Sequence, residues 1–379
     1  MGRLTLEDLR RSTLQRQFPR IEDRDRGSIR ILLELLGPIQ SQVPRAPFLH
    51  LAARMPGIDH ATITAAFESH ELVKTSSIRG TVHTSIRQHY GWLDAVARAP
   101  RTSNLRRELV LQTLSPADVA DEIESFCADG WRSRDTIVVH VQAWLERHDS
   151  ATSAQALTGT FPESLVWGHS GLIRRPRDEH WDKRTDIYHR TARSVLPDVS
   201  VTSPEIALAE LVRVHLGACG PLTREDLAFF FGVGLGQVDR AVSALDEEVT
   251  RQPGPDRDEY LDLAAPPIDG DPDPGLKLLP AFETLLVGLH RRHRTRFIAA
   301  HQLPRVWARA NGLFSPVVLF EGRLVASWKT VTQGGRTDIE VVMLDPCPFL
   351  TDDLFDPAVR AVEQALNVTI GDLRLRGGD

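Results

Sequence analysis

The sequence of 379 residues contains few cysteines, and those few are far apart. No two of Cys127, Cys219 and Cys347 lie within 90 residues of each other, which excludes a Cys-x-x-Cys zinc or iron–sulfur signature. The histidines form no compact ligand pattern either. We therefore expect no metal site and no cofactor.

Long hydrophobic runs are also missing. No stretch approaches the ~18 consecutive apolar residues that a membrane helix requires. Residues 1–30 alternate arginine with acids and lack the apolar core of a signal peptide. We expect a cytoplasmic protein that does not contact a membrane. The hydrophobic content of 41% allows a substantial core, and the length suggests two to four domains.

The chain has no overall excess of positive charge, since its formal net charge is −6. The charges are nevertheless segregated: residues 1–110 hold 17 Arg and Lys against 11 Asp and Glu. Further basic runs occupy residues 174–177 and 290–296, while acids gather in residues 246–273 and after 338. A basic face with an acidic back suits phosphate binding. The 291–296 run fits a DNA-contacting hairpin and a plain solvated surface equally well.

Periodicity and capping residues predict an α+β chain. The expected helices cover residues 29–36, 47–55, 61–72, 116–128, 134–146, 204–216, 224–231, 235–245 and 356–366. The expected strands or extended segments cover residues 75–84, 248–252, 259–263, 317–320, 324–329 and 338–343, and residues 170–189 are expected to form a long basic wing.

Three helices followed by a hairpin form the plan of a winged helix, and residues 201–264 show it most clearly. Related patterns precede it, so we predict tandem winged-helix (helix-turn-helix) units. The predicted divisions are 1–110, 111–200 and 201–264, with a small β-rich C-terminal domain at 265–379 that carries a basic hairpin. Together they would form a curved DNA-binding scaffold. No heptad seam indicates a dimer, so we expect a monomer.

The most informative segment is Leu36-Gly-Pro-Ile-Gln-Ser-Gln-Val-Pro-Arg45, which places Gln40 and Gln42 two residues apart. Glutamine cannot act as a general base near neutral pH, but its amide can orient a water and stabilise developing charge. Alone, such a triplet is more typical of a solvated surface or a backbone cap. The neighbouring segments are therefore needed to distinguish a catalytic amide pair from a surface or capping triplet.

Five further segments accompany the glutamine pair, at residues 47–57, 79–84, 278–283, 311–319 and 321–328. In this order and at these separations they resemble the bacterial winged-helix DNA glycosylases of the AlkZ and YcaQ type, which remove alkylated or crosslinked purines. The catalytic element of that family, Gln-x-Gln or Gln-x-Asp, maps onto Gln40 and Gln42. The second glutamine implies the AlkZ-like branch, which is associated with self-resistance to DNA-alkylating natural products. Ser41 departs from the apolar residue common there.

The resemblance implies double-stranded DNA with N7-alkylated or crosslinked purines as the substrate. Alkylation makes the purine a cationic leaving group, so the enzyme's task is at the sugar. There, fixed dipoles and a held water favour an oxocarbenium-like transition state. None of the four lysines is near the glutamine pair in sequence, so we expect a monofunctional glycosylase that leaves an abasic site. The sequence does not assign the two roles, docking the water and stabilising the sugar cation, to one glutamine or the other.

Candidate DNA-binding residues come from the family pattern and from the basic runs. Thr81 and His83 match the family pattern, although a histidine on a strand is as often structural. Arg45 and Arg54 would contact phosphates near the lesion or pair with carboxylates. The full set of candidate DNA contacts is Arg45, Arg54, Arg79, Thr81, His83, Arg291, Arg292 and Arg294.

Two other classes of function remain open. Tandem winged helices are common in transcription regulators, and a fold does not imply an activity. A regulator needs a recognition helix that reads base edges, but residues 235–245 expose Gln237, Asp239 and Arg240 and are followed by acids. A lesion-binding protein without catalytic activity is the other alternative.

Overall fold

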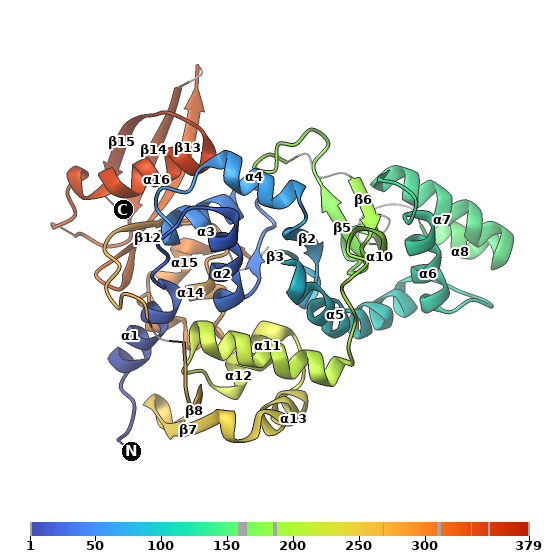
Figure 1. Cartoon of the computed structure of the whole chain (residues 1–379), viewed down its shortest axis with the longest axis horizontal. Helices are drawn as coiled ribbons and strands as arrows, with labels where there is room; N and C mark the ends of the chain where they lie inside the picture. The colour runs from blue at the N-terminus through green and yellow to red at the C-terminus, as the bar shows by residue number, and fades with distance from the viewer. Residues whose placement is uncertain are drawn as a thin grey trace.

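The computed structural model of the chain describes residues 2–157, 165–184, 188–267, 269–308, 312–334, 336–347 and 349–377, with the side chains of residues 99–107 left out. It is a mixed α+β structure, which confirms the predicted class. The C-terminal sheet, the α6–α8 helices and the α11–α13 helices extend from a central body in three directions (Figure 1). Within the described residues, no helix is long and apolar enough to cross a membrane.

The central body starts with two helices and the short strand that carries Gln40. The α2 helix begins where the Asp25 carboxylate accepts from the Ser28 amide at 2.7 Å, and it ends at Gly37, whose φ of +76° turns the chain into β1. The elements are α1 Leu6–Gln17, α2 Arg26–Leu36, β1 Ile39–Gln40, α3 Ala46–Arg54, α4 His60–Glu68, β2 Leu72–Ser76, η1 Ile78–Gly80, β3 Val82–Ile86 and α5 Arg87–Glu108.

Two predictions for this body need correction. The helix expected over 61–72 ends at Glu68, because Leu72 already begins β2. The extended segment expected over 75–84 is interrupted by the turn η1, so β2 and β3 form an antiparallel hairpin. The helices α1 and α5 were not predicted. The turn between β2 and β3 lies beside the glutamine pair, because its Arg79 donates to Gln40.

The second part joins the central body through a shared sheet. Ser115 and Ser133 cap α6 and α7 as their sequence positions predict. The order β1-β3-β2-β5-β6-β4 shows that β2 pairs directly with β5, so the division proposed near residue 110 stays a prediction. The elements are α6 Pro116–Phe126, β4 Arg132–Ser133, α7 Arg134–His148, α8 Ala151–Ala156, β5 Leu172–Arg175, β6 Tyr188–Thr191 and α10 Ala192–Val195.

The predicted basic wing over residues 170–189 contains the antiparallel pair β5 and β6. Residues 185–187 of that wing lie outside the described part, as do Asn311 and Gly335 of the C-terminal segments. The strand β5 also pairs with β2 of the central body, so the assignment of this pair as a wing stays a prediction.

The third part follows its prediction closely. Thr223 and Asp226 form a capping box for α12, and Ser203 caps α11, which runs three residues beyond its expected end before Gly220 and Pro221 stop it. The elements are α11 Pro204–Cys219, α12 Arg224–Phe231, α13 Leu235–Leu245, η2 Asp246–Glu248, β7 Val249–Pro253, η3 Pro255–Arg257 and β8 Glu259–Leu263. The strands β7 and β8 pair as an antiparallel hairpin.

The C-terminal part is built on a sheet of order β15-β14-β13-β12-β9. Its strand β15 is parallel to β14, because the crossover helix α16 lies between them in sequence. The elements are β9 Lys277–Leu279, α14 Thr284–Val287, η4 Arg294–Arg296, α15 Leu303–Val306, β10 Trp307–Ala308, β11 Leu313–Phe314, β12 Val317–Phe320, β13 Arg323–Gln333, β14 Arg336–Met343, η5 Asp352–Phe355, α16 Asp356–Leu366 and β15 Ile370–Arg376. The basic run 291–296 forms turns and η4, so the expected hairpin there is wrong.

One hydrophobic core unites the central body, the third part and the C-terminal sheet, from Leu14 to Leu366. The helices α6–α8 pack around a separate core that includes Ile123 and Val141. The interface between the β2–β3 turn and α12 is thus supported from both sides by the larger core.

Buried histidines predict that acid destabilises the fold. Burial lowers the pKa of His89 to about 4 and that of His215 to about 4, whereas an unfolded histidine titrates near 6.5. Below pH ~6.5 these histidines are therefore protonated in the unfolded chain but stay neutral in the native chain. Each such group should lower the free energy of unfolding by about 1.4 kcal/mol per pH unit.

This expectation can be checked by urea unfolding between pH 6 and pH 5. His89→Gln should reduce the slope of unfolding free energy against pH by about 1.4 kcal/mol per unit. The matched control is His148→Gln, because His148 is exposed. Equal slopes for the unmodified protein and His89→Gln would contradict the expectation.

Candidate active site

The glutamine pair lies at the edge of the six-stranded sheet. Gln40 ends β1, which is the first strand in the sheet order and pairs with β3 through Gln40 and His83. The amide of Ser41 donates to the Val82 carbonyl at 2.7 Å, so the chain stays bonded to β3 between the two glutamines. This bond fixes the backbone of the triplet.

Ser41 itself points away from its two neighbours in the triplet and is completely buried. Its hydroxyl lies 2.8 Å from both the Ile39 carbonyl and the Thr84 hydroxyl. A polar residue is tolerated at this position, where the family resemblance implies an apolar one, because the buried hydroxyl has these partners. The departure from the family pattern is thereby explained.

The two amides contact each other directly. Gln40 Nε2 donates to Gln42 Oε1 at 2.7 Å, and Arg79 Nη2 donates to Gln40 Oε1 at 3.0 Å. Gln40 is only 7% exposed, while Gln42 is partly buried. The pair is therefore an organised, nearly buried polar site and not a solvated surface.

Arg79 occupies the turn η1 between β2 and β3, in the left-handed conformation at φ +56°. Its guanidinium also donates to the Phe230 carbonyl and lies over the rings of Phe229 and Phe230, at 5.6 and 5.4 Å from their centroids. Burial and the nearby Arg294 lower the pKa of Arg79 to about 10. Arg79 is thus still charged at neutral pH.

The side chains of His83 and Thr81 contact the backbone of this turn. His83 Nδ1 lies 3.1 Å from the Thr81 carbonyl and 3.0 Å from the Ser77 hydroxyl. Burial and Arg79 lower the pKa of His83 to about 3, which keeps the ring neutral. The Thr81 hydroxyl donates to the Ile78 carbonyl at 3.1 Å. Because His83 is 1% exposed, its position does not support the predicted DNA contact.

Arg54 and Arg294 lie where a phosphate cannot reach them. Arg54 forms an ion pair with Glu283 at 2.7 Å, and neither side chain is exposed. Arg294 is 2% exposed, donates to the Leu286 carbonyl at 3.0 Å and lies 4.5 Å from the Trp307 ring. Both arginines are structural, and their predicted DNA contact is corrected accordingly.

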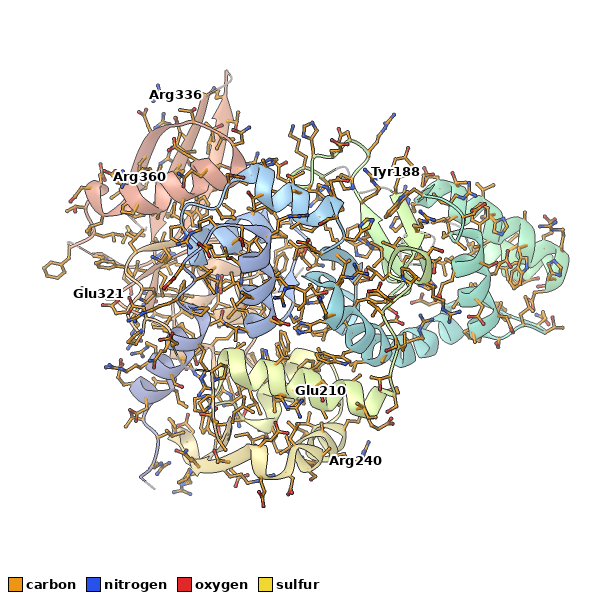
Figure 2. All side chains as sticks on the ribbon, in the orientation of Figure 1. Tyr188, Glu210, Arg240, Glu321, Arg336 and Arg360 are labelled. Carbon is orange, nitrogen blue, oxygen red and sulfur yellow. The ribbon has the colours of Figure 1, made fainter. Side chains whose placement is uncertain are left out.

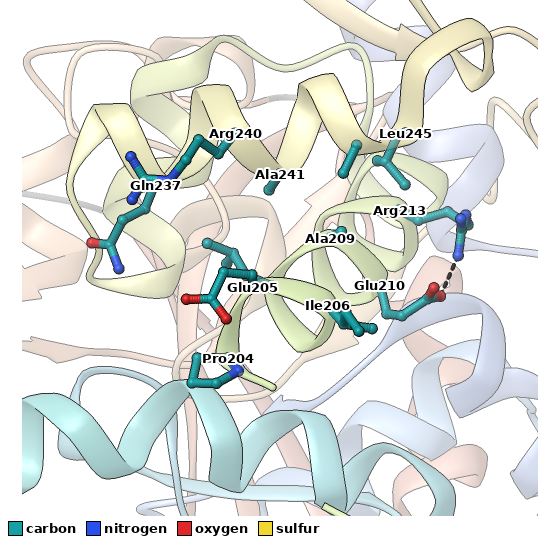
Figure 3. A pocket seen from close by; sticks show the side chains of 12 residues that line it. Pro204, Glu205, Ile206, Ala209, Glu210, Arg213, Gln237, Arg240, Ala241 and Leu245 are labelled. Carbon is teal, nitrogen blue, oxygen red and sulfur yellow. Dashed lines mark hydrogen bonds and ion pairs between the residues drawn. The ribbon is translucent and has the colours of Figure 1, made fainter. Parts of the chain in front are cut away.

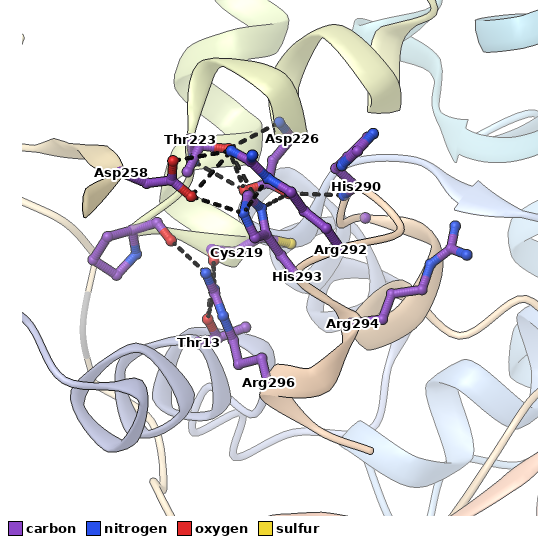
Figure 4. Close-up of polar contacts among 12 residues, drawn as sticks. Thr13, Cys219, Thr223, Asp226, Asp258, His290, Arg292, His293, Arg294 and Arg296 are labelled. Atoms are coloured by element: carbon purple, nitrogen blue, oxygen red, sulfur yellow. Dashed lines mark hydrogen bonds and ion pairs between the residues drawn. The ribbon is translucent and has the colours of Figure 1, made fainter. Parts of the chain in front are cut away.

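The remaining basic candidates differ in their exposure to solvent and in their bonding partners. Arg291 is exposed, whereas Arg292 pairs with Asp258 at 3.0 Å. Asp258 and Asp226 both contact the His293 ring, so the 290–296 segment is tied to the third part (Figure 4). Arg45 is partly buried and donates to the Thr330 hydroxyl at 3.2 Å. Arg45 and Arg291 keep their place as candidate phosphate contacts.

A cavity of about 280 Å³ lies away from this site, between α11 and α13. Figure 3 shows Glu205, Gln237 and Arg240 at its rim. Arg240 and Glu210 lie on the third part, and Arg336 and Arg360 lie on the C-terminal part (Figure 2). None of the glutamine-site residues lines this cavity. Across the described ranges, no three potential ligand side chains come together as a metal would require.

Comparison with known proteins identifies relatives of the whole chain. Residues 33–368 match the model of a family described as DNA glycosylase AlkZ-like. The chain belongs to this family. An interstrand DNA cross-link repair glycosylase of Streptomyces sahachiroi is 23% identical over 333 residues, covering 84% of this chain and 86% of the relative. The solved structure of S. sahachiroi AlkZ aligns with a TM-score of 0.79 at 20% identity, covering 99% of this chain and 100% of that chain.

This AlkZ-like protein is a DNA glycosylase, so the predicted resemblance is confirmed. Family membership favours an enzyme over a transcription regulator or an inert lesion-binding protein. Sequence reasoning missed the contribution of Phe229 and Phe230, which come from α12. Arg79-Gly80 suggests a turn in the sequence, but no local pattern shows what that turn packs against.

The buried pair of Arg54 and Glu283 generates a stability prediction. Arg54→Met should lower the free energy of unfolding by ~3–5 kcal/mol, because it leaves the Glu283 carboxylate buried without its partner. Chemical denaturation checks the value. The double variant Arg54→Met with Glu283→Met should recover part of the loss, since it removes both charges. A loss below ~1 kcal/mol would show that the pair is not the constraint that its burial indicates.

Proposed function

We propose that this DNA glycosylase hydrolyses the N-glycosidic bond of N7-alkylated purines and unhooks interstrand crosslinks. Its role is either DNA repair or self-resistance to a natural product that alkylates DNA. The observation that carries the proposal is the oriented amide pair Gln40 and Gln42 at a sheet edge. Their contacts with each other and with Arg79 hold two carbonyl dipoles in place. Oriented dipoles cost no reorganisation when positive charge develops on the sugar.

The chemistry needs no strong acid. An N7-alkylated purine leaves as a neutral base, so the barrier lies in forming the oxocarbenium-like sugar and delivering water to it. A glutamine carbonyl can accept a hydrogen bond from that water and face the sugar cation. The proposed product is the free base together with an abasic site.

The lysine positions support a monofunctional enzyme. Lys74 is the lysine nearest to the pair by strand register, on β2 opposite Thr84, whereas Gln40 is opposite His83. Neighbouring residues of a strand point to opposite faces, so Lys74 leaves the sheet on the face away from Gln40. Lys329 pairs with Glu340 in the C-terminal sheet at 3.2 Å. Lys74 therefore does not face the Gln40 amide, and the Lys329 amine is engaged by Glu340.

Crosslink unhooking is supported by the position of β1. A base tethered to the opposite strand cannot swing into a closed pocket. The glutamine pair sits on an edge strand, and the S. sahachiroi relative is named as a cross-link repair glycosylase. Duplex binding is assigned to winged-helix units, of which α11–α13 with β7 and β8 is the clearest, and to phosphate contacts from Arg45 and Arg291. The protein is proposed to act as a monomer.

Removal of an N7-alkylguanine from a labelled duplex tests the proposal. Under single-turnover conditions, Gln40→Ala and Gln42→Ala should each lower the rate by about 10²–10³-fold, the loss typical of one preorganised dipole. Gln364→Ala on the exposed face of α16 is the matched control and should leave the rate unchanged. Absence of excision by the unmodified protein on simple adducts and on crosslinks would reject the substrate assignment. Folded glutamine variants with full activity would reject the site.

The pH profile of excision provides an independent check. Amides do not titrate, the pKa of His83 is about 3, and the pKa of Arg79 is about 10. The single-turnover rate should therefore be constant from pH 6 to pH 8. If the logarithm of the rate changed by one per pH unit in that range, a titrating acid or base would take part in the reaction. That result would contradict catalysis by the amide pair.

A further inference from the structure

We propose that Arg79 is a positioning residue of the active site, in place of the DNA contact expected from the sequence. Its guanidinium sets the orientation of the Gln40 amide, and the helix α12 of the third part holds the guanidinium. The proposal rests on the proposed role of the glutamine pair and extends it to a segment about 150 residues away in the chain, as Arg79 and Phe230 are 151 residues apart.

The argument starts from hydrogen-bond chemistry. The oxygen and nitrogen of a side-chain amide have nearly the same shape, so its orientation is decided by its partners. A guanidinium has only donors, so the Gln40 atom 3.0 Å from Arg79 Nη2 must be the oxygen. Gln40 Nε2 then faces Gln42 and donates to its oxygen at 2.7 Å.

This chain of donors gives the pair a direction. Each bond from Arg79 to Gln40 to Gln42 polarises the next one. The oxygens of Gln40 and Gln42 each keep an acceptor site, and the Gln42 NH₂ group is turned away from Gln40. A reversed Gln40 amide would set its NH₂ against the Arg79 donors and break both bonds. Arg79 therefore decides which atoms the pair presents to water and sugar.

Three structural features hold Arg79 in place. The turn is closed by the Ser77 amide, which donates to the Thr81 carbonyl at 3.0 Å. The guanidinium donates to the Phe230 carbonyl at the end of α12. Gly232 completes the contact, because a Cβ at that position would lie 3.0 Å from Arg79 Cγ. The third part of the chain thus helps to build the active site as well as the proposed DNA surface.

The contacts of Arg79 match a positioning role. Nη1 and Nη2 each donate one N–H, to Phe230 and Gln40, and the rings of Phe229 and Phe230 lie against the guanidinium. Arg291 provides the contrast, because it is exposed. The two arginines should therefore separate rate from affinity.

The test compares Arg79→Lys, Arg79→Met and the control Arg291→Met in single-turnover excision and in duplex binding. Both Arg79 variants should lower the saturating rate by about 10–100-fold, the loss typical of a residue that orients another. Their affinity for undamaged duplex and its salt dependence should be unchanged. Arg291→Met should weaken binding and reduce the salt slope by about 1, an effect on affinity that the Arg79 variants should not show.

Arg79→Lys keeps the charge but cannot bridge Gln40 and Phe230 with a planar fork. If lysine restores full activity, or if Arg79→Met lowers the salt slope by about 1, Arg79 is a phosphate contact and the proposal fails. The lysine variant also keeps the test decisive where the methionine variant does not fold.

A readout without catalysis separates this proposal from the proposed function. In protein labelled with ¹⁵N-glutamine, the side-chain NH₂ signals of Gln40 and Gln42 are assigned from Gln40→Ala and Gln42→Ala. Arg79→Lys should shift both signals, and Arg291→Met should shift neither. Unmoved signals overturn the positioning role even where excision is observed. Shifted signals support it even where the chosen lesion is not excised.

Discussion

The fold depends on buried arginines whose hydrogen-bond partners come from distant segments of the chain. Arg54 is the clearest case: it pairs with Glu283, 229 residues away, and also donates to the side chain and carbonyl of Gln17. Arg296 reaches Thr13 and the Pro221 carbonyl in the same way. A buried cation without partners would be costly, so each guanidinium fixes the distance between helices that are remote in sequence. The planar fork of arginine suits this task and the point charge of lysine does not.

This constraint carries over to the chemistry. Because α1, α11 and the loops around α14 are held together by buried guanidiniums, α12 has a defined position against the central body. Arg79 then meets the Phe230 carbonyl on one side and the Gln40 amide on the other. The proposed catalytic pair, Gln40 and Gln42, needs two oriented dipoles and carries no charge that would attract partners. Its orientation therefore has to come from rigid surroundings.

The sequence predicted what is decided locally. Ser115, Ser133 and Thr223 cap helices because a cap needs only the next three residues. The glutamine pair was predicted through its place in a family pattern. The basic run at 290–296 was ambiguous because a count of charges cannot distinguish the exposed Arg291 from the buried Arg294. The partners of Arg294 come from other segments, which local patterns do not show.

The direction of hydrogen bonding also accounts for the form of the motif. The first position must accept from Arg79 and donate to the second position, which an amide does at neutral pH and a carboxylate does not. The second position only has to accept, which a glutamine oxygen and a carboxylate do equally well. Gln-x-Gln and Gln-x-Asp are therefore compatible with the same surroundings, whereas Asp at the first position would leave two acceptors facing each other. On this argument the choice at residue 42 tunes charge beside the sugar, and the choice at residue 40 is fixed by the turn that holds Arg79.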